Sequence, residues 1–429
     1  MEAFALEYSN LLLRWLHVIA AIAWIGESIY FVMLDNSLHP PHGEASRKRG
    51  VFGEMWAVHG GGFYHNQKYL TNPAELPDDL HWSFWKAYTT WLSGFGLFAL
   101  MYLFKPQFYL VNTASPWQWA AHLGGAQASL LAVAFLVVGY IIYSQLCRRI
   151  SPTMNRDGWL SAAVGVMMII VAWLTVQIFP GRAAFLITGA LMATCMAANV
   201  FFWIIPGQRR MVAALKAGQT PDPLDGKRGK QRSVHNTYFT LPVVFLMLSN
   251  HYAFTYTSAQ AWIIMVLFIF AGAVIRQYFV LRHVGKNQLG YPIAGVVMLL
   301  VIGWLAVPPA VMAPASRVAA QAPAVASKAA SAPGAAAQPA APASSAVPVG
   351  LLRVRDIVNV RCIQCHSATP TQAGFTSAPQ GIMFDTDAQL QQHAAQIKQV
   401  VASKYMPLGN ITQMTDPERA DIAAWNPGQ

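Results

Sequence analysis

The sequence has little charge and little cysteine. Only 11% of its 429 residues are Asp, Glu, Lys or Arg, against about 25% in soluble globular domains, and the mean hydropathy is +0.36. Its four cysteines are too few and too scattered for the disulfide framework of a small secreted protein. These shortages argue against an ordinary soluble domain and predict a chain that lies mostly in a lipid bilayer.

Two common classes of partner also lack their sequence signals. The chain contains no G-x-G-x-x-G and no P-loop, so neither a nicotinamide domain nor an ATP domain is evident. The formal net charge is +11, yet the Lys and Arg residues fall in short clusters between apolar runs and not along one basic face, which argues against nucleic acid. The clusters are better explained as signals of membrane topology.

Apolar runs of about 20 residues, the length that crosses the hydrocarbon core, occur eight times. They cover residues 10–34, 85–104, 124–146, 159–179, 183–205, 236–252, 261–281 and 291–307. The first run is too long for a cleavable signal peptide and follows acids instead of cations, so we expect it to remain as an anchor. We therefore predict an all-α fold in which residues 1–307 form a polytopic eight-helix transmembrane bundle.

Loop charges predict the orientation of this bundle. Alternate loops carry sixteen Lys and Arg residues, whereas the intervening loops carry only Lys105 and Arg182. By the positive-inside rule the first set faces the cytoplasm, which places both termini outside.

Beyond the last span the composition changes twice. Residues 308–349 are rich in Ala, Pro and Ser without aromatic or acidic residues, which predicts an extended linker that cannot bury a core. Residues 350–429 carry enough Ile, Leu, Val and Met for a small globule, which a large buried cofactor would help to stabilise. Near its end we expect a helix with Asp416 near its start and Trp425 on an apolar face, which resembles the last helix of class I cytochromes c.

The globule contains the stretch "RCIQCHSATP", with Cys362, Cys365 and His366 in the order C-x-x-C-H. This spacing attaches a c-type haem, because two thioethers form to the porphyrin and the histidine coordinates the iron. Covalent attachment takes place on the outer side of the membrane, where the loop charges independently place this segment.

A sixth iron ligand is then needed. "KYMPLGN" offers Met406, whose thioether would raise the reduction potential and suit an electron acceptor. Met383 and Met414 are the competing candidates.

Polar residues inside the predicted spans mark function more often than chance, because ionisable groups cost several kcal/mol there. The group near the outer side comprises Arg14, His17, His122, Gln127, Gln177, Asn250 and His251. Because His17, His122 and His251 come from three helices, they are candidate ligands of a second, b-type haem. The alternative is that each histidine bonds a neighbouring helix or lies at the interface.

The first cytoplasmic loop contains the unusual stretch "MWAVHGGGFYHNQKYL", residues 55–70. Its donors and its glycine backbone predict a site for a planar ligand. We expect catalytic roles for His59, His65 and Lys68. The expected substrate-binding residues are Gly60, Gly61, Gly62, Tyr64, Asn66 and Gln67.

The eight spans, the "WAVHGGGFYHNQKY" loop, the Ala/Pro linker and a terminal C-x-x-C-H domain with "YMPLGNITQMTDPER" together resemble the bacterial membrane-bound urate oxidases, also called urate hydroxylases. The resemblance covers essentially the whole chain except the linker. It implies oxidation of urate to 5-hydroxyisourate in purine catabolism, with water as the oxygen source. It also implies an inner-membrane protein whose periplasmic haem c passes electrons to a soluble cytochrome c or a terminal oxidase.

The sequence leaves the position of the urate site open. A site at His59 and His65 would lie in the cytoplasm, so electrons would have to cross about 30 Å of hydrocarbon to reach the haem. A site around the outer histidines would not need that crossing, and a histidine in either place is a natural general base near neutral pH.

Two rival functions also remain. One is a cytochrome-bearing electron-transfer subunit of another dehydrogenase or oxidase, with no substrate site of its own. Such a carrier would have little use for the "HGGGFYHNQ" loop. The other is a haem-dependent sensor or structural membrane protein, although no signalling domain is evident beyond the cytochrome.

Overall fold

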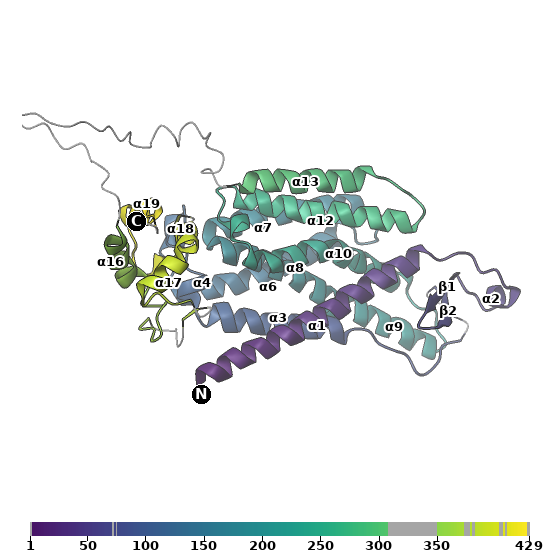
Figure 1. Cartoon of the computed structure of the whole chain (residues 1–429). Coiled ribbons are helices and arrows are strands. Elements are labelled where there is room, and N and C mark those ends of the chain that lie inside the picture. Colours follow the sequence, from purple (N-terminus) through teal and green to yellow (C-terminus); the bar gives the residue numbers. More distant parts are fainter. Residues whose placement is uncertain are drawn as a thin grey trace, which may run out of the picture. The chain divides into compact units, whose positions relative to one another are not determined.

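The computed structural model of the chain describes residues 2–70, 73, 75–307, 350–372, 378–379, 382–402, 406–407 and 410–426. It divides into two compact units, Met1–Leu305 and Ala306–Gln429 (Figure 1).

The first unit is a helical bundle, and a helix covers each of the eight apolar runs. The helices are α1 (Glu2–Asn36), α3 (Trp85–Phe98) with the π-helical turn η1 (Ala99–Leu103), α6 (Gly125–Ile150), α7 (Asp157–Ile178), α8 (Gly181–Asn199) with η2 (Val200–Ile204) and α9 (Ile205–Lys216), α10 (Pro223–Leu248), α12 (Ala261–His283) and α13 (Gly290–Ala306). The short elements of this unit are α2 (Glu44–Lys48), α4 (Pro106–Tyr109), α5 (Gln118–Ala121), η3 (Ser249–His251) and α11 (Ala253–Tyr256).

Among the described residues, five helices are long and apolar enough to cross a membrane. They are Tyr8–Asn36, Gly125–Ile150, Asp157–Ile178, Gly181–Lys216 and Ala261–His283. The length and apolar composition of these helices indicate that the chain is a membrane protein. The other three runs fall short for local reasons. Helix α13 has only 17 residues, α3 has only 14, and the first half of α10 is rich in Lys and Arg. The count of eight spans stays a prediction.

Small residues let these helices approach closely. A Cβ atom on Gly272 of α12 would lie 2.8 Å from Cδ of Pro242, which lies inside α10. A Cβ atom on Gly189 of α8 would lie 2.8 Å from Cβ of Leu246. Glycine at such contacts is typical of helix packing in membranes, where van der Waals fit replaces the hydrophobic driving force.

A buried polar network ties α6, α8 and α10 together. The Tyr143 hydroxyl lies 2.7 Å from His235 Nδ1 and accepts a hydrogen bond from Asn199 Nδ2 at 2.9 Å. Asn199 also donates to Asn236 Oδ1 at 2.9 Å, and the Arg232 guanidinium lies over the Tyr143 ring at 5.3 Å. Because buried polar groups are costly when unpaired, this network fixes the register of the three helices.

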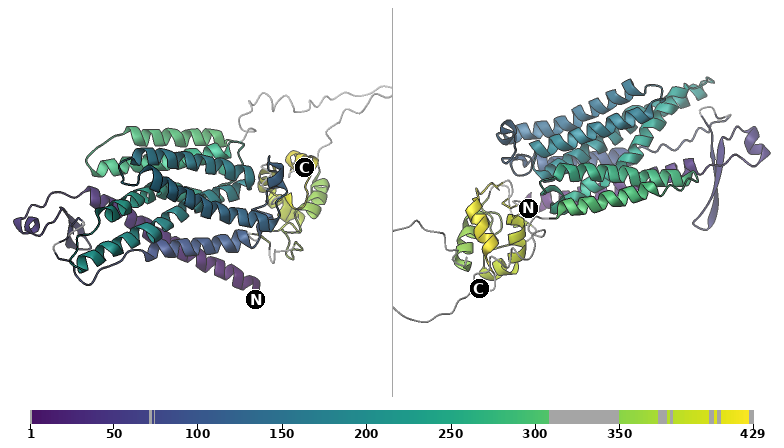
Figure 2. Two further views of the ribbon diagram at one scale, coloured as in Figure 1. Left: turned by 180° about the vertical axis from the view of Figure 1, so that it is seen from behind. Right: turned by 90° about the horizontal axis from the view of Figure 1, so that it is seen from above.

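The glycine-containing loop is a β-hairpin, which the all-α prediction missed. Strand β1 (Gly53–His59) pairs antiparallel with β2 (Gly62–Lys68), so that His59 faces Gly62. The turn residues Gly60 and Gly61 have φ angles of +59° and +81°, which suits a two-residue type I′ turn. The hairpin lies beyond the C-terminal end of α1 (Figure 2).

The second unit contains α16 (Leu351–Arg361), α17 (Asp387–Gln392), α18 (Ala394–Ala402) and α19 (Asp416–Ala424). Trp425 is fully buried, as its position on an apolar face predicted, in a core with Ile357, Leu390 and Ile422. The N-cap of α19 is Thr415, whose hydroxyl accepts from the backbone N–H of Glu418, so the predicted capped helix is confirmed.

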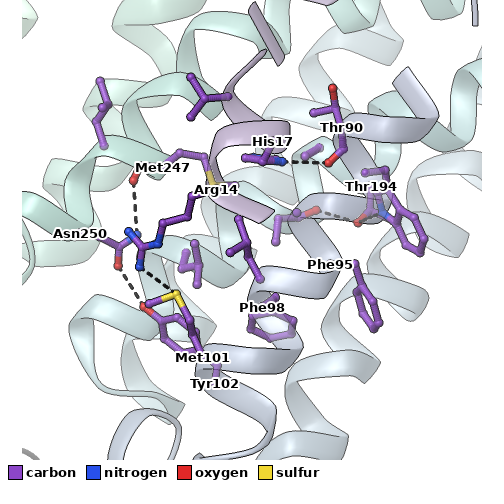
Figure 3. Close-up of a pocket in the computed structure, with 18 of the residues that line it drawn as sticks. Arg14, His17, Thr90, Phe95, Phe98, Met101, Tyr102, Thr194, Met247 and Asn250 are labelled. Atoms are coloured by element: carbon purple, nitrogen blue, oxygen red, sulfur yellow. Dashed lines mark hydrogen bonds between the residues drawn. The ribbon is translucent and has the colours of Figure 1, made fainter. Parts of the chain in front are cut away.

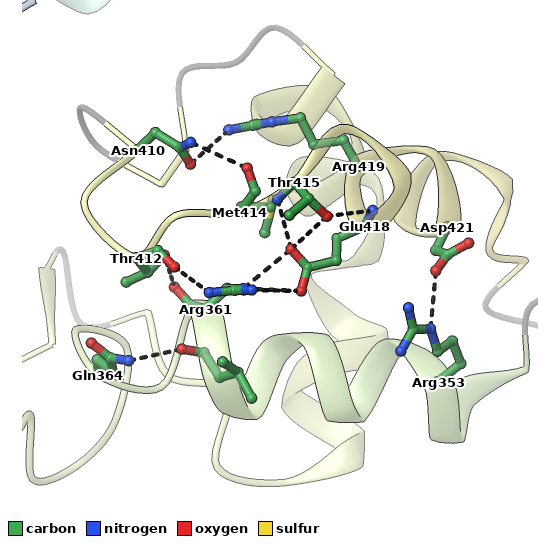
Figure 4. Close-up of polar contacts among 11 residues, drawn as sticks. Arg353, Arg361, Gln364, Asn410, Thr412, Met414, Thr415, Glu418, Arg419 and Asp421 are labelled. Atoms are coloured by element: carbon green, nitrogen blue, oxygen red, sulfur yellow. Dashed lines mark hydrogen bonds and ion pairs between the residues drawn. The ribbon is translucent and has the colours of Figure 1, made fainter. Parts of the chain in front are cut away.

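A partly buried ion pair joins the two ends of this unit. Arg361, the last residue of α16, lies 3.0 Å from Glu418 of α19 and donates to the Thr412 carbonyl at 2.5 Å (Figure 4). The backbone N–H of Thr415 and the Arg361 guanidinium outweigh burial and hold the pKa of Glu418 below its ordinary value. This contact fixes the residue that immediately precedes the C-x-x-C-H motif.

Candidate functional site

A cavity of about 320 Å³ opens in the helical bundle and is lined by α1, α3, η1, α6, α8, the end of α10 and η3 (Figure 3). The rings of Trp91, Phe95 and Phe98, which follow one another along α3, form part of its wall. Trp91 and Phe95 are stacked with centroids 5.3 Å apart. The volume lies at the small end of the range for ligand pockets, which suits a bicyclic molecule better than a porphyrin.

Two arginines line the cavity, Arg14 of α1 and Arg182 of α8. Among the described residues, no Asp or Glu lines it. Arg14 donates to Asn10 Oδ1 at 2.6 Å and to the Met101 sulfur at 3.0 Å, and both partners are neutral. Cations at membrane depth are costly without a counter-charge, so this cavity favours an anionic ligand.

Asn250 of η3 connects several polar groups of the same cavity. Its Oδ1 accepts a hydrogen bond from Arg182 Nε at 3.2 Å and another from the Tyr102 hydroxyl at 3.1 Å. With its oxygen occupied, the Asn250 amide nitrogen is oriented as a donor, and the nearest acceptor found for it is the Met247 carbonyl at 3.4 Å.

Two of the three histidines expected to hold a second haem line this cavity. His17 and His251 contribute to its wall, and the His17 ring projects from the same helix as Arg14 (Figure 3). His122 is not among the lining residues; it is exposed at the end of α5 and its Nδ1 lies 2.7 Å from the Gln118 carbonyl. The structure thus brings His17 and His251 to one cavity and leaves His122 outside it.

The hairpin separates the three residues predicted to be catalytic there. Successive residues of a strand point to opposite faces, so His65 lies on one face of the hairpin, whereas His59 and Lys68 lie on the other. Along the strands His59 is next to the turn and Lys68 is at the base.

His65 and Lys68 both have structural partners. His65 Nε2 lies 3.0 Å from the buried Glu54 carboxylate, and its ring stacks on Trp56 at 4.2 Å. A backbone hydrogen bond from His42, together with His65 and against the effect of burial, holds the pKa of Glu54 below its ordinary value. Lys68 Nζ lies 2.6 Å from Asp35 Oδ1 at the end of α1.

The remaining predicted hairpin residues are also dispersed. Gly60 and Gly61 form the turn, and Tyr64 is exposed. Gln67 donates to Ser46 Oγ at 2.9 Å, and Asn66 Nδ2 is buried without a hydrogen-bond partner. These residues have local roles in the hairpin, and their positions do not gather them around one site for a planar ligand.

The C-x-x-C-H residues form a tight turn directly after α16. The backbone N–H groups of Cys365 and His366 both donate to the Cys362 carbonyl, at 3.1 and 2.9 Å. His366 Nδ1 lies 2.9 Å from the Ile382 carbonyl, which leaves Nε2 as the nitrogen available to a metal. Histidine ligands are usually oriented through their other nitrogen in this way.

Burial sets the protonation of these three side chains. It raises the pKa of the Cys362 thiol to about 12 and also raises the pKa of the Cys365 thiol. Burial lowers the pKa of His366, although the bond to Ile382 opposes the shift. A neutral imidazole with a fixed ring therefore adjoins two neutral thiols, an arrangement that fits a covalently attached haem. Within the described ranges, no group of three or more His, Cys, Asp or Glu side chains is placed to hold a metal ion.

The three methionine candidates have different surroundings. Met414 is buried in the core of the unit, whereas Met406 and Met383 are partly exposed. Arg419 Nη1 donates to the Met406 carbonyl at 2.8 Å, and the Met406 N–H donates to the Val400 carbonyl at 2.9 Å. Met406 therefore has a backbone held by two hydrogen bonds and a side chain that is only partly buried, and its role as sixth ligand stays a prediction.

Residues 3–307 match the family model described as "Urate oxidase N-terminal". The chain belongs to this family. The urate oxidase N-terminal match covers every helix of the first unit and the cavity between them, whereas the second unit lies outside it. It supports an oxidase role related to urate, with urate as the substrate. The searches of curated proteins and of solved structures gave no match.

Several lining residues of this urate oxidase family member were not assigned to a site from sequence. Arg14 and Asn250 were noted only as polar groups near the outer side, and Arg182 only as a loop cation. Trp91, Phe95 and Phe98 recur at helical spacing, a signal that could have placed them on one face of a helix, but only packing shows that this face borders a cavity with Arg182.

Proposed function

We propose that this protein oxidises urate to 5-hydroxyisourate within its membrane unit and passes the electrons to a c-type haem in its C-terminal unit. The observation that carries the proposal is the cavity, whose described lining residues combine two arginines and an aromatic wall without an acid, in a chain of the urate oxidase family. A planar anion is the ligand that this combination favours.

The chemistry of urate matches the cavity group by group. Urate is a planar anion near neutral pH, and a guanidinium from Arg14 or Arg182 would neutralise it through charge-assisted hydrogen bonds. The Asn250 amide would donate to a ring carbonyl. The wall of Trp91 and Phe95 would cover a face of the bicycle, since aromatic faces favour planar partners.

The C-terminal unit would hold the electron acceptor. Cys362 and Cys365 would form the thioethers, His366 would coordinate the iron, and Met406 would be the second axial ligand. When bound, the haem accepts one electron at a time. Electrons would then leave to a soluble cytochrome c or a terminal oxidase, so water and not dioxygen would supply the new oxygen atom of the product.

The loop charges and the C-x-x-C-H motif together favour an orientation with the C-terminal unit in the periplasm and the membrane unit in the bacterial inner membrane. The cavity residues then fall in the outer half of the bilayer, which shortens the path that electrons have to cover. This is why we propose the cavity and not the hairpin as the urate site.

A single anaerobic experiment tests the function. Full-length protein in lipid nanodiscs, oxidised beforehand, is mixed with urate and the haem absorbance is followed. We expect reduction of the haem, and the product formed in isotopically labelled water should carry the label. A haem that stays oxidised with urate, yet is reduced by dithionite, would instead support a carrier subunit without a substrate site.

A further inference from the structure

We propose that His17 is the general base of this reaction and that α3 holds its ring in the reactive orientation. The inference rests on the proposed function and adds to it the residue that removes a proton from the attacking water. Three features of the surroundings of His17 support it.

The first feature is the hydrogen bonding of its ring. His17 Nδ1 lies 3.0 Å from the Thr90 carbonyl oxygen (Figure 3). It also lies 3.2 Å from Ser93 Oγ. A carbonyl only accepts, so Nδ1 carries the hydrogen and Nε2 carries the lone pair. Across the described ranges, no hydrogen bond to His17 Nε2 is found, so its lone pair is available to a molecule in the cavity that the residue lines.

The second feature is the close approach of α3. A Cβ atom on Gly94 would lie 2.7 Å from His17 Cε1, closer than real Cβ atoms come to other atoms. The ring therefore rests directly on the backbone of α3, on the turn that supplies Thr90 and Ser93. Any side chain at this position would push the imidazole away from its present orientation.

The third feature is the charge around the ring. Arg14 lies one helical turn away on α1, and Arg182 of α8 and His251 of η3 line the same cavity. Ser93 and the Thr90 carbonyl on α3 are neutral. The Arg14 guanidinium opposes a proton on His17 while no anion is bound, and a bound anion reduces that opposition. The base therefore takes up a proton most readily when the substrate is in place.

In the proposed step the purine first gives up two electrons, one after the other, to an acceptor that a c-type haem in the C-terminal unit would supply. A water molecule then adds to C5 of the oxidised purine: the oxygen–carbon bond forms as an O–H bond breaks, and the proton passes to His17 Nε2. Urate monoanion and water thus give neutral 5-hydroxyisourate, two electrons and one proton, which His17 later releases to solvent.

His17→Gln is the direct test in the full-length protein. Glutamine can still donate to the Thr90 carbonyl but cannot act as a base near neutral pH. Because general-base catalysis contributes about 10²–10⁴-fold, we expect kcat for urate-driven haem reduction to fall within that range. The KM for urate should change little, the fall of kcat at acid pH should disappear, and dithionite should still reduce the haem at the wild-type rate.

Two glycines of α3 provide a matched pair. Gly94→Ala keeps the imidazole but displaces it, and we expect most of the kcat to be lost. Gly96→Ala adds the same methyl group two residues further along, where the nearest atom outside α3 is Leu13 Cδ2 at 3.8 Å, and we expect near-normal kcat. Equal loss in both variants would point to general damage to α3 and would overturn the positioning by Gly94.

Other results would overturn the inference while leaving the proposed function intact. His17→Gln with normal kcat and an unchanged pH profile would mean that another group is the base. A wild-type pyridine haemochrome spectrum with a b-type haem that disappears in His17→Gln would make His17 a metal ligand. Wild-type haem that urate does not reduce at all would contradict the proposed function itself, which separates the two failures.

Discussion

The Nδ1 atom of His366, the last residue of the C-x-x-C-H motif, lies 2.9 Å from the carbonyl oxygen of Ile382. The two residues are sixteen positions apart in sequence, so the chain returns to orient the imidazole that follows the two cysteines. This geometry supports the assignment of the second unit as a haem domain, and the assignment can be tested directly.

Replacing Cys362 and Cys365 together with alanine should remove covalently bound haem, because no thioether can then form. The membrane unit should still insert, since its helices do not depend on this motif. Haem staining after denaturing electrophoresis measures the first effect and membrane fractionation the second. A stained band of full length in the double variant would contradict the attachment.

Met406→Ala should remove the absorption band typical of a sulfur–iron bond and lower the reduction potential of the haem, because a thioether ligand raises it. Met414→Leu is the control, since Met414 is buried in the core and leucine conserves its volume. An unchanged spectrum in Met406→Ala would redirect the assignment to Met383 or Met414.

Arg14→Met should raise the KM for urate by about 10- to 100-fold, because a hydrogen bond to a charged group contributes about 1.5–3 kcal/mol. Reduction of the haem by dithionite should not change. Arg47→Gln serves as the control, because Arg47 lies in α2 outside the cavity. Equal KM values for Arg14→Met and wild type would show that this guanidinium does not bind the anion.

Glu418→Gln should make the second unit less stable, by an amount that depends on pH. The pKa of Glu418 is lowered in the folded state, so its contribution is complete above the ordinary glutamate pKa of about 4.3. The contribution is lost as the pH falls through the lower folded-state value. The free energy of unfolding of variant and wild type should therefore converge in acid, with Asp356→Asn at an exposed position as control. A difference that grows in acid would contradict this account.

His59→Ala distinguishes the hairpin from the cavity as the urate site. With urate bound in the cavity, this variant should keep most of the urate-driven haem reduction, because His59 is exposed beside the hairpin turn. Stopped-flow absorbance with urate and then with dithionite provides the measurement. Loss of the first reaction alone would return the substrate site to the hairpin.

Patterns that depend on neighbouring residues were predicted well from the sequence. A helix covers each apolar run because apolar length and backbone hydrogen bonding act within one segment. The capped helix with Trp425 followed from residues within eleven positions of each other. The hairpin was missed although Gly60 and Gly61 are a two-residue turn signal, because the glycines were interpreted as a binding surface.

The cavity could not be predicted, because it is a property of packing between distant segments. Arg14, Arg182 and Asn250 come from three elements, and no sequence spacing relates them. Likewise, nothing in the sequence shows that Gly94 supports the His17 ring, since the contact joins α1 to α3. The outer polar residues could be identified from the sequence, but not which of them line the same cavity.

Among the described residues that line the cavity, no acid accompanies Arg14, and this bears on which purines the protein accepts. A neutral purine of the same outline would fill the same volume but bring no negative charge to this guanidinium in a medium of low dielectric constant. Urate carries the missing charge with it. The protein would then select among purines mainly by their negative charge and only secondarily by their shape. The neutral product would bind less tightly than the urate anion from which it forms, which favours its release.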